Sequence, residues 1–276
     1  MKPHERTVAI AVAPNGARKT KADHPALPMT PAELAACAQA CCAAGAAMIH
    51  VHVRDKEGRH ILDAEAYRAA FAAIRSAVGD RLILQATTEA VGIYPRAAQM
   101  ALLRKLRPEA ASLAIREIMP DAASEAEGAA FLAWAHRERI WAQYILYNPE
   151  EVVRFETLRR RGVIPTARPS VLLVLGRYTA GQQSAPRDLL PFLSALDPAV
   201  DWSVCAFGRD ECACALAAAA LGGGARVGFE NNLLLADGAT APSNAALVAQ
   251  LAAGLAAMGR RPATADELRA RRASDR

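Results

Sequence analysis

The sequence is poor in aromatic residues and lacks long apolar segments. Phe, Trp and Tyr make up 5% of the 276 residues, and basic residues exceed acidic ones by only five. Few aromatic side chains for base stacking and a mild, scattered positive charge argue against nucleic acid as a partner. No apolar run approaches the roughly 18 residues that a transmembrane helix needs. The first residues lack a small-residue cleavage site, so we expect neither a membrane partner nor a signal peptide.

The six cysteines form no recognisable metal or redox motif. Cys37 and Cys41 lie one helical turn apart in an Ala-rich segment, and Cys212-Ala213-Cys214 does not have the spacing of a zinc ribbon. We interpret the cysteines as small buried apolar side chains in a reducing compartment, which predicts a cytoplasmic protein.

The sequence does contain a large apolar fraction and a regular alternation of strand and helix patterns. Hydrophobic residues make up 53% and charged residues 22%, which predicts one folded domain over residues 1–276. Several strands are nearly continuous apolar runs, as in parallel sheets covered on both faces. The predicted strands are Thr7–Ala13, Ala47–Val53, Leu82–Thr87, Ala110–Ile115, Arg139–Leu146, Ser170–Leu175, Asp201–Ala206 and Ala225–Glu230.

An amphipathic helix follows each strand. The predicted helices begin near Thr30, Asp63, Pro95, Ser124, Pro149, Arg187, Arg209 and Ser243. Eight strand–helix pairs predict a parallel (β/α)8 TIM barrel, whereas a doubly wound sheet would carry Gly-x-Gly-x-x-Gly after its first strand. The segments Thr30-Pro31-Ala32-Glu33 and Thr264-Ala265-Asp266-Glu267 are helix-capping patterns. The second predicts a short C-terminal helix outside the barrel.

The pattern with the most specific chemistry is His50-Val51-His52. Side chains alternate along a strand, so both imidazoles share one face, about 7 Å apart at their Cα atoms. They lie near the carboxyl end of the second strand, where barrels place their active sites. The pair predicts a divalent metal site, with Zn²⁺ the favoured ion. Two core histidines satisfied by backbone groups are the alternative.

A metal site needs a third ligand, and Glu230 is the favoured candidate. Glu230 ends the last strand, which in a closed barrel neighbours the first strand, and the first neighbours the second. Two histidines and one carboxylate leave an open position for substrate, as catalytic zinc requires. His24 and His60 in loops stay possible ligands, and Glu230 could instead form an ordinary ion pair.

Five segments recur in the order and spacing of one enzyme family. They are Pro14–Ala17 with Leu27–Glu33; Gly45–Asp55; Leu175-Gly176; Trp202 with Gly208-Arg209; and Gly222-Gly223 through Asn232. Together they cover nearly the whole chain, and in them the sequence resembles the β-keto acid cleavage enzyme family.

The resemblance implies a zinc-dependent (β/α)8 acyltransferase that is usually a homo-oligomer, here a dimer or tetramer. Such enzymes combine a β-keto acid with acetyl-CoA and release acetoacetate and the CoA thioester of the shortened acid. The family's metal ligands correspond to His50, His52 and Glu230. Arg226 corresponds to the arginine that holds the substrate carboxylate or developing charge. The hydroxyl residues after the third strand correspond to Thr87 and Thr88.

Two further expectations concern how the substrates bind. Backbone N–H groups near Gly222, Gly223 and Gly224 are expected to accept CoA phosphates at the barrel mouth, unless these glycines only form a tight turn. Arg18 stands where a relative that cleaves an amino-substituted keto acid has an acidic residue. With Arg116, it predicts a substrate with a second anionic or polar end. A solvated loop arginine or a CoA-phosphate contact is the alternative for Arg18.

The sequence departs from the family pattern at Asn231, where the family usually has an aspartate that acts in proton abstraction. An amide cannot accept a proton as a base. Glu89 and Glu117, in the loops after the third and fourth strands, are possible substitutes or ordinary loop charges. Two other functions therefore stay open: a metal-dependent hydrolase of the same barrel class, and a non-catalytic protein that binds zinc and acyl-CoA.

Overall fold

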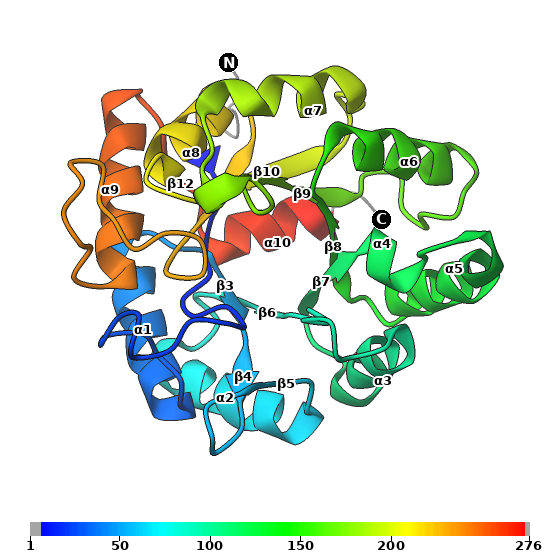
Figure 1. Cartoon of the computed structure of the whole chain (residues 1–276), viewed down its shortest axis with the longest axis horizontal. Coiled ribbons are helices and arrows are strands. Elements are labelled where there is room, and N and C mark those ends of the chain that lie inside the picture. Colours follow the sequence, from blue (N-terminus) through cyan, green and yellow to red (C-terminus); the bar gives the residue numbers. More distant parts are fainter. Residues whose placement is uncertain (1–6, 274–276) are drawn as a thin grey trace.

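A computed structural model describes residues 7–273 and shows a closed barrel of eight parallel strands. Around the barrel the strands follow the order β10-β11-β2-β3-β6-β7-β8-β9 (Figure 1). The predicted TIM barrel is therefore confirmed, and the last barrel strand does pair with the first. The strands are β2 (Ile10–Val12), β3 (Met48–Val51), β6 (Ile83–Ala86), β7 (Ala110–Ala114), β8 (Trp141–Leu146), β9 (Ser170–Leu175), β10 (Asp201–Ala206) and β11 (Gly224–Val227).

Helices surround the barrel on its outside, as Figure 1 shows. The predicted capping box is present at Thr30, whose side chain accepts from the Glu33 N–H, and Gly45 ends the same helix in the left-handed conformation. The surrounding helices are α1 (Pro31–Ala44), α2 (Ala64–Val78), α3 (Arg96–Leu106), α4 (Ile115–Ile118), α5 (Ala122–Arg137), α6 (Pro149–Arg160), α7 (Leu190–Ala195), α8 (Glu211–Ala220) and α9 (Asn244–Ala257).

The main hydrophobic core lies between the barrel and these helices. Ile49 and Val51 of β3 belong to it, together with fully buried helix residues such as Leu34 and Tyr67. Because side chains alternate along a strand, a core that takes Ile49 and Val51 outward leaves His50 facing the barrel interior. The packing of the core thereby orients the histidine.

Two predicted strands are divided in the structure. The segment expected at residues 7–13 forms β1 (Thr7–Val8), which pairs with β12 (Arg261–Pro262), and only then β2 of the barrel. The segment at 47–53 forms β3 and then β4 (Val53–Arg54), which pairs with β5 (His60–Ile61). Each run changes its hydrogen-bonding partner part of the way along, and a propensity pattern cannot show such a change.

Smaller differences occur elsewhere. The helix expected near Arg187 begins as a 3₁₀ turn over Pro186–Leu189, before α7. Another 3₁₀ turn covers Ala180–Gln182. Arg139, expected to begin a strand, has a φ of +62° and precedes β8. A left-handed residue does not fit a strand, so β8 begins at Trp141.

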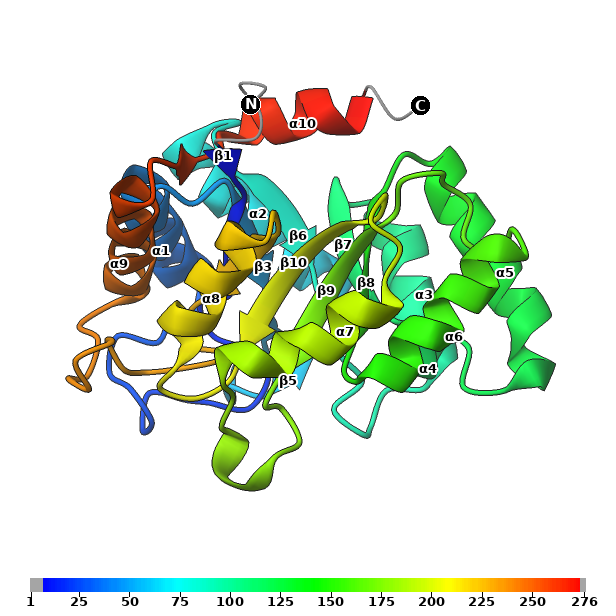
Figure 2. The ribbon, with the colours of Figure 1, turned by 90° about the horizontal axis from the view of Figure 1, so that it is seen from above.

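The predicted C-terminal helix is α10 (Ala265–Ala273), and it covers one end of the barrel. Figure 2 shows α10 across the end from which the strand arrows point away. Its Leu268 packs with Met48 and Ile83 near the amino ends of β3 and β6. The carboxyl ends of the strands therefore lie at the opposite end of the barrel. Within residues 7–273, every helix is too short or too polar to traverse a bilayer.

Candidate functional site

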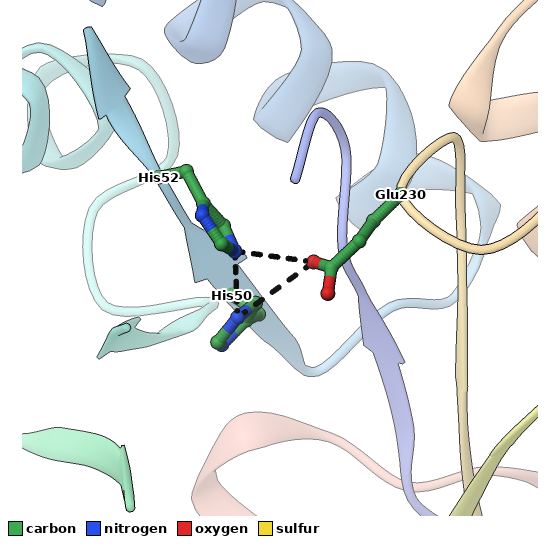
Figure 3. A group of neighbouring side chains, drawn as sticks. All are labelled: His50, His52 and Glu230. Carbon is green, nitrogen blue, oxygen red and sulfur yellow. Dashed lines mark hydrogen bonds and ion pairs between the residues drawn. The ribbon is translucent and has the colours of Figure 1, made fainter. Parts of the chain in front are cut away.

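Three possible ligand atoms converge where β3 and β11 end. The Nε2 atoms of His50 and His52 are 3.1 Å apart. Glu230 Oε2 lies 3.3 Å from Nε2 of His52 and 3.7 Å from Nε2 of His50, along the dashed lines of Figure 3. The three side chains form a group that could hold one metal ion. The structure thus brings together the residues that strand alternation and barrel closure predicted.

The donor set and its surroundings fit a metal ion. Glu230 Oε2 is buried and has no hydrogen-bond partner among residues 7–273. A buried carboxylate oxygen without a partner costs free energy unless a cation compensates it. Two imidazoles and one carboxylate are the donors of many catalytic zinc sites.

Gln85 fixes the tautomer of His50. It lies opposite His50 on β6, and its Oε1 is 2.8 Å from His50 Nδ1. An amide oxygen only accepts, so Nδ1 carries the hydrogen and Nε2 keeps its lone pair for a metal. Burial, aided by Arg226, lowers the pKa of His50 to about 3. The ring is therefore neutral at pH 7, as a metal ligand must be.

Glu230 lies beyond its strand and not at its end. β11 ends at Val227, and Gly228 then turns the chain with a φ of +137°. A Cβ on Gly228 would lie 2.4 Å from the Ala13 carbonyl oxygen, so only glycine allows this turn. Glu230 N–H donates to the same carbonyl, which holds residue 230 beside the end of β2.

Arg226 is the cation beside the three ligand atoms. Its Nη2 donates to Glu230 Oε1 at 3.0 Å and lies 3.5 Å from Asn231 Oδ1. Burial works to raise the pKa of Glu230, but Arg226 and the histidines outweigh it and hold this pKa well below its ordinary value. Arg226 Nε and Nη1 are buried and have no hydrogen-bond partner within the described part of the chain. Two donors are thus available to an anion.

A small cavity adjoins His50, Glu230 and Arg226, and both polar and apolar residues line it. It includes the predicted site residues Thr87, Thr88, Glu89 and Glu117. Its remaining lining is Ala114, Ile145, Tyr147, Val174, Arg177 and Phe207.

The two carboxylates suggested as substitute bases have different surroundings. Glu89 Oε2 is 3.8 Å from His52 Nδ1, and its Oε1 is 3.7 Å from Arg177. Glu89 therefore faces the side of His52 that points away from the other ligands. Glu117 lies on α4 across the cavity, and burial raises its pKa. A raised pKa makes Glu117 a better proton acceptor than an ordinary carboxylate.

The expectation that Gly222, Gly223 and Gly224 lie at the barrel mouth is wrong. Gly222 and Gly223 precede β11 and Gly224 begins it, so all three lie at its amino end, away from Glu230. There they line a larger cavity of about 800 Å³ with Trp202 and Arg271. A Cβ on Gly223 would lie 2.4 Å from the Trp202 ring, which explains the glycine by close packing. Barrel enzymes work at the carboxyl ends of their strands, so this cavity is not the candidate active site.

The two predicted substrate arginines do not line the cavity. Arg18 is exposed in the loop after β2. The Arg116 guanidinium lies 3.8 Å from the ring centre of Tyr147 and 4.8 Å from that of Tyr178, and Nη1 is 3.3 Å from Glu151. The stacking and the ion pair hold Arg116 outside the cavity.

Sequence reasoning missed two charged residues at the site. Lys19 Nζ donates to the Glu230 carbonyl oxygen at 2.7 Å. Glu211, at the start of α8, is buried and accepts from the Gly228 N–H at 3.0 Å. Lys19 looked like one of several loop cations, and Glu211 like a helix N-terminal charge. Only its place directly after Asp210 in a Gly-Arg-Asp-Glu turn could have drawn attention to Glu211.

The barrel and the convergent His, His and Glu are typical of a metal-dependent (β/α)8 enzyme. The family model of the beta-keto acid cleavage enzymes matches residues 7–272, and the chain belongs to this enzyme family. It is 30% identical over 281 residues to the 3-keto-5-aminohexanoate cleavage enzyme of Fusobacterium nucleatum, covering 94% of this chain and 95% of the relative. It is also 30% identical over 273 residues to the 3-oxoadipate:acetyl-CoA acetyltransferase of Cupriavidus necator, covering 95% and 93%.

Solved structures share the fold. The apo structure of ObcA superimposes with a TM-score of 0.69 at 18% identity, over 89% of this chain. The match spans only 65% of the ObcA chain. A type I 3-dehydroquinate dehydratase from Clostridium difficile gives a TM-score of 0.58 at 13% identity, over 92% of each chain. At these identities the likeness concerns the fold alone.

Proposed function

We propose that this protein exchanges acyl groups between a β-keto acid and acetyl-CoA. The bond between the keto carbon and the α carbon of the keto acid breaks, and the α carbon bonds to the acetyl carbonyl carbon. The acetyl C–S bond breaks, and the CoA sulfur bonds to the former keto carbon. The products are acetoacetate and the CoA thioester of the shortened acid. The observation that carries the proposal is the convergence of His50, His52 and Glu230 beside Arg226, in a chain of this family.

The three convergent side chains would hold Zn²⁺. A bound zinc ion acts as a Lewis acid that polarises a carbonyl oxygen and stabilises enolate charge. The chain itself prepares the ligands, since Gln85 orients His50 and Arg226 keeps Glu230 ionised. A neutral imidazole and an ionised carboxylate are the forms that bind a cation.

Arg226 would bind the substrate carboxylate. Arg226 lines the cavity, and its unpartnered Nε and Nη1 are donors left for charge-assisted hydrogen bonds to an anion. Thr87 Oγ1 accepts from the Glu89 N–H at 3.1 Å, so its own hydrogen is free to donate to a substrate oxygen. The apolar side chains of Ile145 and Val174 would take the rest of the keto acid.

A panel of β-keto acids tests the proposal. With acetyl-CoA, we expect acetoacetate and a new acyl-CoA from at least one acid, and no reaction without acetyl-CoA. Product formed without a CoA thioester would instead indicate a hydrolase. Binding of acetyl-CoA without product would indicate a non-catalytic protein.

Metal analysis tests the zinc site independently of turnover. We expect about one zinc per wild-type chain and little in His50→Ala or His52→Ala. Unchanged metal content in both variants would contradict the assigned ligands.

A further inference from the structure

A buried carboxyl group lies against the segment that carries Glu230, in contact with Gly228, Asn231 and Asn232. Glu211 is only 2% exposed, at the start of α8. It accepts from the Gly228 N–H, and its oxygens are 3.4 Å from the side-chain nitrogens of Asn231 and Asn232. Three N–H donors thus converge on the Glu211 carboxyl group. Burying a carboxyl group costs free energy, which suggests that it serves the site rather than the fold.

The Asn231 side chain connects Glu211 to Arg226. Asn231 Nδ2 donates to Glu211 Oε1 at 3.4 Å and to the Arg226 carbonyl oxygen at 3.2 Å. Its Oδ1 is thereby turned toward Arg226 Nη2, 3.5 Å away. The Asn231 amide cannot take a proton. Its hydrogen bond to Glu211 fixes its orientation, and this orientation keeps its oxygen directed at the Arg226 guanidinium.

We propose that Glu211 is a positioning residue for the reaction: its carboxyl group holds Arg226 in place through Asn231 and, once ionised, supplies the buried negative charge that position 231 lacks. This inference rests on the proposed function. In the family pattern this charge usually stands at position 231 itself, as an aspartate. Here the charge is one hydrogen bond further from the substrate, on α8.

The arrangement predicts that the negative charge can be moved from residue 211 to residue 231 only if both residues are changed in the same protein. Asn231→Asp alone would place two carboxylates 3.4 Å apart in a buried site, where they repel. Glu211→Gln alone would leave an amide facing an amide and no negative charge beside Asn231. The double variant Glu211→Gln/Asn231→Asp restores one carboxylate and one amide. Glutamine at 211 can still accept from the Gly228 N–H through its Oε1.

A double-mutant cycle tests the inference by steady-state kinetics. Burial raises the pKa of Glu211 to about 8, so the assays are run at pH 9, where the carboxylate is ionised. We expect each single variant to lose about 10-fold or more in kcat, with KM changed less, and the double variant to regain most of the loss. Unchanged kcat in Glu211→Gln would overturn the inference. The inference would also be overturned if the activity of the double variant were no higher than the activity expected from two independent losses.

The same four proteins separate this inference from the proposed function. If the wild type cleaves no β-keto acid, the proposed function fails, and the coupling is measured by thermal unfolding at pH 9. We then expect Asn231→Asp to lower Tm clearly more with Glu211 present than with glutamine at 211. Equal decreases would overturn the inference. As a control, Glu156→Gln on α6 removes another buried carboxylate, one that pairs with Arg159, and its effect should add to that of Asn231→Asp.

Discussion

The Glu230 side chain packs directly against the backbone of Gly16. A Cβ on Gly16 would lie 2.7 Å from Glu230 Cγ, and Gly16 has a φ of +60°. Arg54 donates to the Gly16 and Ala17 carbonyl oxygens and so fixes this loop. The absence of a side chain at residue 16 therefore sets where the Glu230 carboxylate can lie.

We expect Gly16→Ala to weaken zinc binding. The added methyl must displace Glu230 Cγ, because the Arg54-bound loop cannot retreat. Gly162→Ala is the matched control, since Gly162 has a φ of +73° with nothing within 4 Å of the added Cβ. Each variant should lose about 1 kcal/mol of stability from left-handed strain. Only Gly16→Ala should lose zinc in a chelator competition, and equal zinc affinities would contradict the packing argument.

Gln85 should tune zinc affinity without touching the ion. Gln85→Leu removes the acceptor from His50 Nδ1, and loss of such a partner typically weakens a metal site by about 10–100-fold. Gln143 lies one hydrogen bond further away, 3.2 Å from Gln85 Nε2. Gln143→Leu should therefore weaken zinc binding much less. The dissociation constants from competition titrations give the test, and identical values for the two variants would show that Gln85 has no special role.

The sequence predicted the three possible ligands because each inference rested on a periodic or topological rule. Strand alternation places His50 and His52 on one face, and barrel closure places the loop of Glu230 beside them. The same rules could have prevented the error over Gly222–Gly224. Residues at the start of a parallel strand lie at the opposite end from residues after it, and these glycines lead into β11.

These rules could not predict the contacts of Lys19 and Glu211 or the exposure of Arg18. Loop side chains have no fixed period, so the sequence could not show that Lys19 faces Glu230 while Arg18 faces solvent. Glu211 opens a helix, a common place for an exposed acidic residue. Its burial follows from the turn at Gly228, whose N–H donates to it. That contact joins the start of α8 to the loop after β11, and only the folded chain reveals it.

We expect Lys19 to matter for metal binding and Arg18 not to. Lys19→Met keeps the aliphatic stem but removes the donor from the Glu230 carbonyl oxygen, and hydrogen bonds to charged groups contribute about 1.5–3 kcal/mol. The segment that carries Glu230 should loosen, so zinc affinity should fall. Arg18→Met, one residue earlier and exposed, is the control. Equal zinc affinity of both variants, measured by competition, would show that Lys19 does not hold Glu230.

Glu211 should make the stability of the wild type depend on pH. Burial raises its pKa from an ordinary 4.5 to about 8, against the opposing effects of the Gly228 N–H, the two asparagine amides and Arg226. Between these values the unfolded chain has released the proton and the folded chain still holds it. The folded state therefore loses relative stability as pH rises from about 4.5 to 8. Glu211→Gln has no such proton, so its Tm relative to the wild type should rise over that range.

Thermal unfolding of both proteins at pH 5, 6.5, 8 and 9, under one zinc condition, measures the difference. Each kcal/mol corresponds to roughly 2–4 °C in a chain of this size. Other groups that interact with Glu211, namely Lys19, Cys205, Cys212 and Cys214, are present in both proteins, so their titration largely cancels. Glu267→Gln is the control, because the pKa of Glu267 is shifted in the opposite direction from that of Glu211. Its hydrogen bond from Arg261 lowers the pKa of Glu267 to about 2, so the stability it adds is lost only below pH 4.5. Relative to wild type, its Tm should stay constant from pH 5 to 9. The same constancy for Glu211→Gln would mean that Glu211 is ionised throughout.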